Sequence, residues 1–257
     1  MHHVLMSRLH RKTCLKLDGL LGDWLGYSQA FLGDNLTRLA REEADLNYCQ
    51  RCGQGVGRGE PTSTGCGTCR GRSAILDGVV RVGPFHGVLA ELIRSLKYGG
   101  RWELAEPMGQ MLAERLKPRI QIHRGECHWA IIPIPMPRWR RWYRGVDHAG
   151  LIAASVARHL EFPLLMPLKK RGGPPQATLS RSRRNKSSRD DYRVVRAGIR
   201  GFGGVLPNLE DRSVILIDDV LTTGRSMCAA GSQLRRLGPA RIIAGALAVT
   251  EKRESPK

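Results

Sequence analysis

The sequence lacks any long hydrophobic run. Of its 257 residues 41% are hydrophobic, yet no apolar stretch approaches the roughly 18 residues that a helix needs to span a bilayer. Residues 1–26 hold neither an uninterrupted apolar segment nor a small-residue cleavage site, so we expect no signal peptide. These absences predict a cytoplasmic protein without membrane insertion, in which cysteines stay reduced.

Acidic residues are also scarce. The chain has 23 Asp and Glu against 42 Lys and Arg, which gives a formal net charge of +19. A surface this basic attracts polyanions by electrostatic steering and counterion release. The charge therefore favours nucleic acid or a phosphate-rich ligand as partner, and it supports no sequence-specific recognition.

The chain contains no G-x-x-x-x-G-K-[ST] segment, which excludes a P-loop NTPase. This matters because the apolar run Val214–Ile217 is followed directly by Asp218 and Asp219, as in a Walker B strand. The same pattern occurs in receiver domains, but the chain after Val220 is too short to complete one. Two solvated acids at a strand end remain the simplest alternative, and that reading leaves the next residues unexplained.

Those next residues predict a phosphate site. Thr222, Thr223, Gly224 and Ser226 offer hydroxyls and open backbone N–H groups where a helix begins, an arrangement that binds anions. In open α/β sheets, ligands bind at the carboxyl end of the strands, where the two acids are expected. Carboxylates beside a phosphate cradle suit a sugar phosphate, because the acids can accept hydrogen bonds from ribose hydroxyls.

The segment resembles the phosphoribosyl-pyrophosphate (PRPP) signature of type I phosphoribosyltransferases. The resemblance implies the following PRPP-binding residues: Asp218, Asp219, Thr222, Thr223, Gly224, Arg225 and Ser226. It also implies Mg²⁺, bound together with PRPP and held chiefly by substrate and water. No general base can be identified, so the catalytic residues stay unknown.

Four of the seven cysteines form two C-x2-C pairs separated by thirteen residues: Cys49, Cys52, Cys66 and Cys69. Two such pairs can close a tetrahedral, all-thiolate site for a structural Zn²⁺. The intervening segment is too polar and glycine-rich to form a core, so the metal would hold this module together. A vestigial site or redox-active dithiols are the alternatives.

Strands alternating with helices predict a parallel sheet flanked by helices, an α/β fold of the type I phosphoribosyltransferase kind with a small four-cysteine zinc ribbon in front. We expect an N-terminal helical segment at 1–47, the zinc ribbon at 48–72 and the phosphoribosyltransferase-like domain at 73–251. Within that domain the expected strands lie at 74–85, 130–135, 162–168, 214–217 and 241–249, and the expected helices at 88–100, 103–116, 146–160 and 225–237.

Two loops concentrate positive charge. The first, residues 135–145, interleaves arginines with Trp139, Trp142 and Tyr143; the second spans residues 169–196. The resemblance to type I phosphoribosyltransferases implies that the first loop binds pyrophosphate, although it could equally stack on single-stranded bases. For the second loop the resemblance implies a mobile lid that closes over PRPP and excludes water. For the first loop, the alternative to a pyrophosphate loop is a solvated basic loop. For the second loop, the alternative to a mobile lid is a disordered basic linker. The candidate pyrophosphate residues are Arg138, Arg144, Gly145, Lys169 and Arg171.

Together, the cysteine knuckles, a helix ending "IRSLKYGG", a strand ending "PIP", a basic "KKR" segment and the terminal "IDDVLTTGRSM" resemble the ComF family. That family consists of phosphoribosyltransferase-like proteins linked to bacterial DNA uptake during natural competence. The resemblance implies a PRPP-binding protein and leaves open whether it is a pentosyltransferase. The alternative is a non-catalytic accessory protein that binds single-stranded DNA, with the zinc module docking a helicase-like competence protein.

One departure from the family pattern concerns the first basic loop. Relatives usually carry an Asn-Gln pair where this chain has Asp147 and His148. Asp147 can cap the following helix as Asn would. His148 adds a titratable group near the expected pyrophosphate position.

Overall fold

The computed structural model describes residues 47–57, 63–71, 74–121, 128–137, 145–170, 191–195 and 208–251. These residues all belong to one compact unit, Asp45–Lys257. The predicted helical segment at 1–47 lies outside the described residues except for Asn47, and so do Arg138, Arg144 and Arg171 of the basic loops. In the described part of the chain, no helix is long and apolar enough to cross a membrane.

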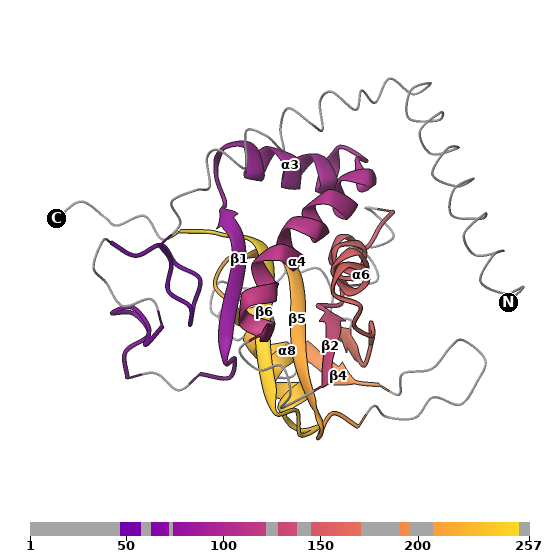
Figure 1. Ribbon diagram of the computed structural model, residues 1–257. Helices are drawn as coiled ribbons and strands as arrows, with labels where there is room; N and C mark the ends of the chain where they lie inside the picture. Colours follow the sequence, from indigo (N-terminus) through magenta and orange to yellow (C-terminus); the bar gives the residue numbers. More distant parts are fainter. Residues whose placement is uncertain are drawn as a thin grey trace, which may run out of the picture. The chain divides into compact units, whose positions relative to one another are not determined.

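The core of the fold is a four-stranded parallel sheet (Figure 1). Its strands follow the order β1-β6-β5-β2. The bounds are β1 Gly78–Pro84, β2 His128–Pro133, β5 Arg212–Leu221 and β6 Arg241–Val249. Nearly every residue of these strands is buried, as expected for a parallel sheet covered on both faces. The predicted fold class is confirmed.

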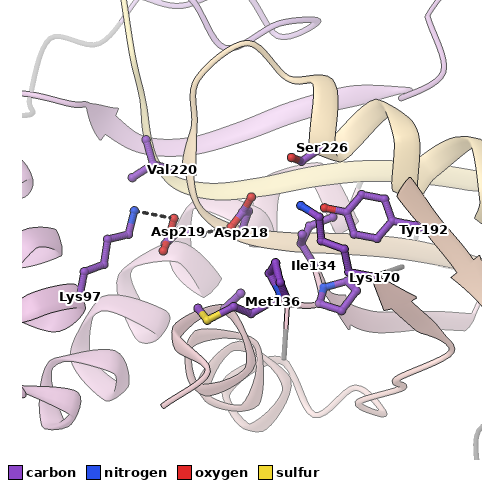
Figure 2. A pocket seen from close by; sticks show the side chains of 12 residues that line it. Lys97, Ile134, Met136, Lys170, Tyr192, Asp218, Asp219, Val220 and Ser226 are labelled. Atoms are coloured by element: carbon purple, nitrogen blue, oxygen red, sulfur yellow. Dashed lines mark hydrogen bonds and ion pairs between the residues drawn. The ribbon is translucent and has the colours of Figure 1, made fainter. Parts of the chain in front are cut away.

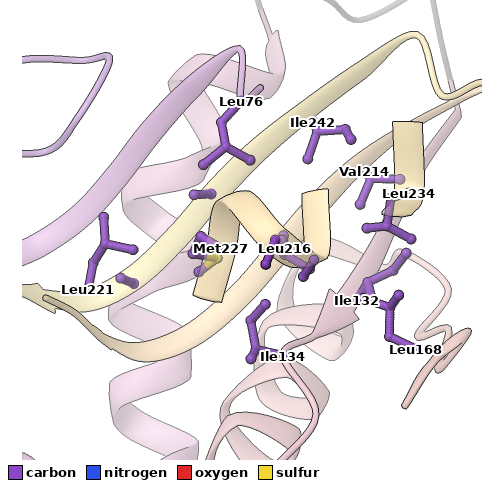
Figure 3. Packing of buried hydrophobic residues seen from close by; sticks show 14 of the residues in the cluster. Leu76, Ile132, Ile134, Leu168, Val214, Leu216, Leu221, Met227, Leu234 and Ile242 are labelled. Carbon is purple, nitrogen blue, oxygen red and sulfur yellow. The ribbon is translucent and has the colours of Figure 1, made fainter. Parts of the chain in front are cut away.

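Helices cover both faces because successive strand side chains point to opposite sides. On one face, Val214 and Leu216 of β5 pack with Met227 of helix α8 (Arg225–Arg235), as Figure 3 shows. On the other face lie α4 (Ala105–Gln121) and α6 (His148–Leu160). Glycine at position 245 of β6 leaves room there for Ile217, whose Cδ1 atom would lie 2.8 Å from an added Cβ.

Helix α3 (Gly87–Tyr98) follows β1, whose arrowhead points toward it in Figure 1. One face of α3 is apolar and buried. A short 3-10 helix, η1 (Trp102–Leu104), joins α3 to α4. Since α3 begins where β1 ends, the C-terminal turn of α3 can supply side chains to the carboxyl end of the sheet.

The structure corrects three sequence expectations. Residues 162–167 do not form a strand: Leu164 makes only an isolated bridge to Ile131, because prolines at 163 and 167 remove two donors, and of the expected strand 162–168 only Leu168 lies in one. The predicted loop 169–196 contains strands at both ends, β3 (Leu168–Lys170) and β4 (Tyr192–Val194), paired antiparallel. Strand β5 also continues past the two acids to Leu221, because β6 is long enough to pair with it there.

The expected cap of α6 is confirmed. Asp147 is the N-cap residue, and its Oδ1 accepts a hydrogen bond from the backbone N–H of Gly150 at 3.2 Å. The side chain thereby satisfies one of the helix N–H groups that lack an intrahelical partner. His148, the first residue of α6, is 2% exposed and does not line the cavity described next.

Candidate functional site

A cavity of about 200 Å³ lies where β5 passes its two acids (Figure 2). Of the predicted PRPP-binding residues, Asp218, Asp219 and Ser226 line this cavity. The segment after β2 forms another wall, because Ile134 N–H donates to the carbonyl oxygen of Ile217 at 2.8 Å. The full lining is Lys97, Ile134, Pro135, Met136, Pro137, Ala149, Lys170, Tyr192, Asp218, Asp219, Val220 and Ser226.

The two adjacent acids have different surroundings. Asp219 is 9% exposed, whereas Asp218 faces the cavity with intermediate exposure and protein atoms around its other sides. Burial raises the pKa of the Asp218 carboxyl to about 8, and the negative charge of Asp219 adds to the rise. The backbone N–H of Asp219, which donates to Asp218 Oδ1 at 2.9 Å, opposes the rise together with Lys97 and Lys170. Near neutral pH, Asp218 can therefore hold a proton.

Two lysines supply the positive charge of the cavity. Lys97 comes from the last turn of α3, and its Nζ lies 2.9 Å from Asp219 Oδ1. Lys170 comes from β3, with its Nζ 5.3 Å from the ring centroid of Tyr192 on β4. Neither lysine, nor Tyr192, was among the residues predicted from the sequence. Only the "IRSLKYGG" motif pointed to Lys97, and it gave that residue no role.

The predicted phosphate loop runs along the surface beside the cavity. Thr222, Thr223 and Arg225 are exposed, and Gly224 is the N-cap of α8 with φ 70°. A left-handed backbone at this position suits glycine, which has no Cβ to clash. The loop thus presents its backbone at the start of an eleven-residue helix. Of its five predicted residues, only Ser226 reaches the cavity lining.

The candidate pyrophosphate residues that the structure describes are Gly145 and Lys169, and both are exposed. Gly145 precedes α6 with φ 73°. Lys169 does not line the cavity, whereas its neighbour Lys170 does, since alternate residues of a strand point to opposite sides.

The four predicted cysteines come together. All four Sγ atoms lie within 4.8 Å of one another, and the Cys49–Cys69 and Cys52–Cys66 sulfur pairs are 3.9 and 3.7 Å apart. Zn–S bonds of about 2.3 Å in a tetrahedron place sulfurs about 3.8 Å apart. The donor set and its spacing therefore fit a tetrahedral metal ion.

The backbone of the first knuckle favours a thiolate. Burial raises the pKa of the Cys49 thiol, but hydrogen bonds from the backbone N–H groups of Cys66, Arg51 and Cys52 outweigh it and lower the pKa to about 7. The Cys66 N–H lies 3.2 Å from Cys49 Sγ. Because the thiolate is the form that ligates metals, the knuckle geometry favours metal binding at this residue.

The four-cysteine module contacts the sheet through its own side chains and backbone. The carbonyl oxygen of Gln50 accepts a hydrogen bond from Val79 N–H of β1 at 2.7 Å. Gln54 Nε2 donates to the carbonyl oxygen of Thr250, just past β6, at 2.9 Å. The guanidinium carbon of Arg81 lies over the ring of Tyr48, 5.1 Å from the ring centroid. The module is thus attached to β1 and to the end of β6.

Several known proteins are similar to this chain. The Phosphoribosyl transferase domain family matches residues 145–257, the part that holds both acids, the loop and α8. Competence protein F of Haemophilus influenzae is 27% identical over 203 residues, covering 78% of this chain and 84% of that protein. DNA utilization protein YhgH of Escherichia coli K12 is 23% identical over 200 residues, covering 77% and 82%.

Solved structures align more distantly. A purine phosphoribosyltransferase from Pyrococcus horikoshii is 19% identical, with 61% of this chain and 80% of that chain aligned and a TM-score of 0.33. The AQ2163 protein of Aquifex aeolicus is 13% identical, with 68% and 89% aligned and a TM-score of 0.37. The family match and the sequence relatives agree with the motifs: they support the resemblance to the ComF family, and residues 145–257 match a phosphoribosyl transferase domain.

Proposed function

We propose that the cavity beside β5 binds PRPP or a related ribose 5-phosphate ligand. One observation carries the proposal: Asp218, Asp219 and Ser226 line a single cavity next to the start of α8. The carboxylates would accept hydrogen bonds from the ribose hydroxyls. The hydroxyls and N–H groups of Thr222–Ser226 would bind the 5-phosphate, as helix N-termini do.

The reaction that such a site supports is pentosyl transfer. The bond from C1′ to the pyrophosphate oxygen breaks, its electron pair leaves with pyrophosphate, and an acceptor forms a new bond to C1′. Lys97 and Lys170 line the cavity and contribute positive charge where negative charge develops on the leaving group. No side chain among the described residues is assigned as general base.

Two metals enter the proposal. Zn²⁺ would be held by Cys49, Cys52, Cys66 and Cys69 as a structural ion, because four thiolates leave no open coordination position. Mg²⁺ would accompany PRPP, held chiefly by ligand oxygens and water, and would screen the charge of the pyrophosphate.

We also propose that the protein acts in DNA uptake, on the basis of relatives named competence protein F and DNA utilization protein. The net charge of +19 favours a second candidate function, a non-catalytic module that binds single-stranded DNA. In that case the zinc module would dock a helicase-like partner. The two functions differ in whether the cavity holds a sugar phosphate.

Isothermal titration calorimetry tests the proposal. PRPP with Mg²⁺ is titrated into the wild type, into the double variant Asp218→Asn/Asp219→Asn, and into Asp211→Asn as control. Asp211 is an exposed acid just before β5, so its loss leaves the cavity intact. We expect the double variant to bind PRPP at least about tenfold more weakly, since one hydrogen bond to a charged carboxylate contributes about 1.5–3 kcal/mol.

Equal PRPP affinity in the wild type and the double variant would remove the assignment of the two acids. A wild type that binds single-stranded DNA with a steep salt dependence but does not bind PRPP would favour the accessory module instead.

A further inference from the structure

The function proposed above leaves one cavity residue without a specific role. Lys97 lies in the last turn of α3, and the earlier turns of this helix bury Leu89, Leu92 and Ile93 in the core. Its side chain is only 16% exposed, and its Nζ lies 2.9 Å from Asp219 Oδ1, whose side chain is 13% exposed. Figure 2 shows the ammonium reaching Asp219 from the side opposite Lys170. A surface ion pair would have neither this burial nor a cavity beside it.

The strand geometry explains why Lys97 meets the second acid. Val214, Leu216 and Asp218 alternate with Ile215, Ile217 and Asp219 along β5. The first set shares the face that α8 covers, and Asp218 lies toward Ser226 in Figure 2. Asp219 points to the other side, where the last turn of α3 arrives. The neighbouring acids thus belong to two different layers of the protein.

The charge balance of the cavity depends on this pair. Two adjacent carboxylates with no nearby cation would repel both each other and an anionic ligand. Lys97 on α3 and Lys170 on β3 face Asp218 and Asp219 on β5, and the Tyr192 phenol on β4 lines the same cavity. The ion pair of Lys97 with Asp219 places an ammonium directly against one of the two acids. Lys97 also lies outside the matched domain, residues 145–257.

We propose that Lys97 is a positioning residue: it holds the Asp219 carboxylate toward the ribose hydroxyls of the pentose phosphate ligand. The Lys97 ammonium also offsets the negative charge that this ligand meets in the cavity. This role rests on the proposed function. A partly buried pair of this kind orients both groups, because the ammonium and the carboxylate each lose rotational freedom. The helix before the matched domain thereby completes the ligand site inside it.

Calorimetry with ribose 5-phosphate tests this role, because the ligand probes the acid pair without pyrophosphate. The variants are Lys97→Met, which removes the charge, and Lys97→Arg, which keeps it. Lys117→Met is the control: Lys117 also sits on a helix and pairs with a carboxylate, Glu114, but on the surface. We expect at least a tenfold weaker affinity for Lys97→Met, recovery to within about threefold for Lys97→Arg, and no change for Lys117→Met.

The pH profile separates positioning from mere packing. In Lys97→Met we expect the affinity to fall more steeply than in the wild type between pH 6 and 9, because ionising acids then repel the ligand phosphate without an opposing ammonium. Added Mg²⁺ should recover part of this loss. If Lys97→Met does not fold, Lys97→Gln takes its place, since its amide can still donate to Asp219 but carries no charge.

The failure of this role differs from the failure of the proposed function. A Lys97→Met protein with wild-type affinity and pH profile overturns the role of Lys97 alone. A wild type that binds neither ribose 5-phosphate nor PRPP overturns the proposed function, and the role of Lys97 with it.

Discussion

At the scale of the residue, the acid pair shows how one strand creates two different carboxyl groups. Asp218 and Asp219 are neighbours in the chain, but strand alternation directs one toward Ser226 and the other toward Lys97. Asp219 gains an ion pair within 2.9 Å, while burial and its neighbour raise the pKa of Asp218 to about 8. The pair is therefore suited to accept hydroxyl hydrogen bonds while it carries less than two full negative charges.

The raised pKa of Asp218 predicts a pH-dependent stability. Below about pH 4 the carboxyl is protonated in the folded and the unfolded chain alike. As the pH rises toward 8 only the unfolded chain ionises freely, so the free energy of unfolding falls, by up to about 1.4 kcal/mol per pH unit. Asp218→Asn should remove this decline. Urea denaturation of the wild type and the variant between pH 5 and 9 measures it.

The control for this measurement is Asp211→Asn, which changes an exposed acid near the other end of β5. The free energy of unfolding of Asp211→Asn should change with pH in the same way as that of the wild type between pH 5 and 9. If the curves for Asp218→Asn and the wild type run parallel between pH 5 and 8, Asp218 is ionised in the folded protein at neutral pH.

At the scale of the element, the contact between α4 and α6 depends on a small residue. A Cβ added at Gly109 of α4 would lie 2.4 Å from Ser155 Cβ and 3.0 Å from the carbonyl oxygen of Ile152, both on α6. Ser155 Oγ in turn donates to the carbonyl oxygen of Glu106 at 2.8 Å. The two helices approach closely here, and α6 is the helix that supplies Ala149 to the cavity wall.

Gly109→Ala should therefore lower the free energy of unfolding by about 1–3 kcal/mol, the usual cost of an overpacked contact. Helix propensity alone would predict the opposite sign, because alanine favours a helix over glycine by about 1 kcal/mol. The neighbouring exposed Gln110→Ala is the control and should change little. Urea denaturation decides: a stabilised Gly109→Ala would mean that the helices move apart without cost.

At the scale of the whole molecule, the four-cysteine module and the sheet depend on each other. Gln50 and Gln54 bind the backbone at Val79 and Thr250, and Thr250 N–H donates to the carbonyl oxygen of Leu221, the residue before the predicted phosphate loop. Arg81, 1% exposed on β1, contacts Tyr48 of the module and pairs with Glu251 at 3.3 Å. The module thus contacts the edge strand β1 and the residues just past the end of β6.

Removal of the metal should therefore destabilise the whole protein. We expect one zinc per chain in the wild type and none in Cys69→Ser, with a loss of about 2 kcal/mol and a Tm lower by about 4–8 °C. Elemental analysis and calorimetry measure the two quantities. Cys228→Ser, on α8 and outside the cluster, is the control and should retain the zinc. A Cys69→Ser protein with full zinc content would show that the metal is held elsewhere.

The sequence by itself determined the local features of this protein. The spacing of the four cysteines, the apolar run before the two acids, the glycine at the start of α8 and the Asp147 cap each involve residues close together in the chain. Local backbone geometry links such residues directly, so their positions follow from the pattern. The family resemblance rests on the same segments.

Only the tertiary structure decided which distant residues complete the cavity. The ion pair of Lys97 with Asp219, the place of Lys170 beside Tyr192 and the extension of β5 to Leu221 all depend on how separate elements pack and pair. Sequence periodicity shows which face of α3 is buried, but not which strand end its last turn meets. That partner is fixed by the order β1-β6-β5-β2 and by the direction in which α3 leaves β1.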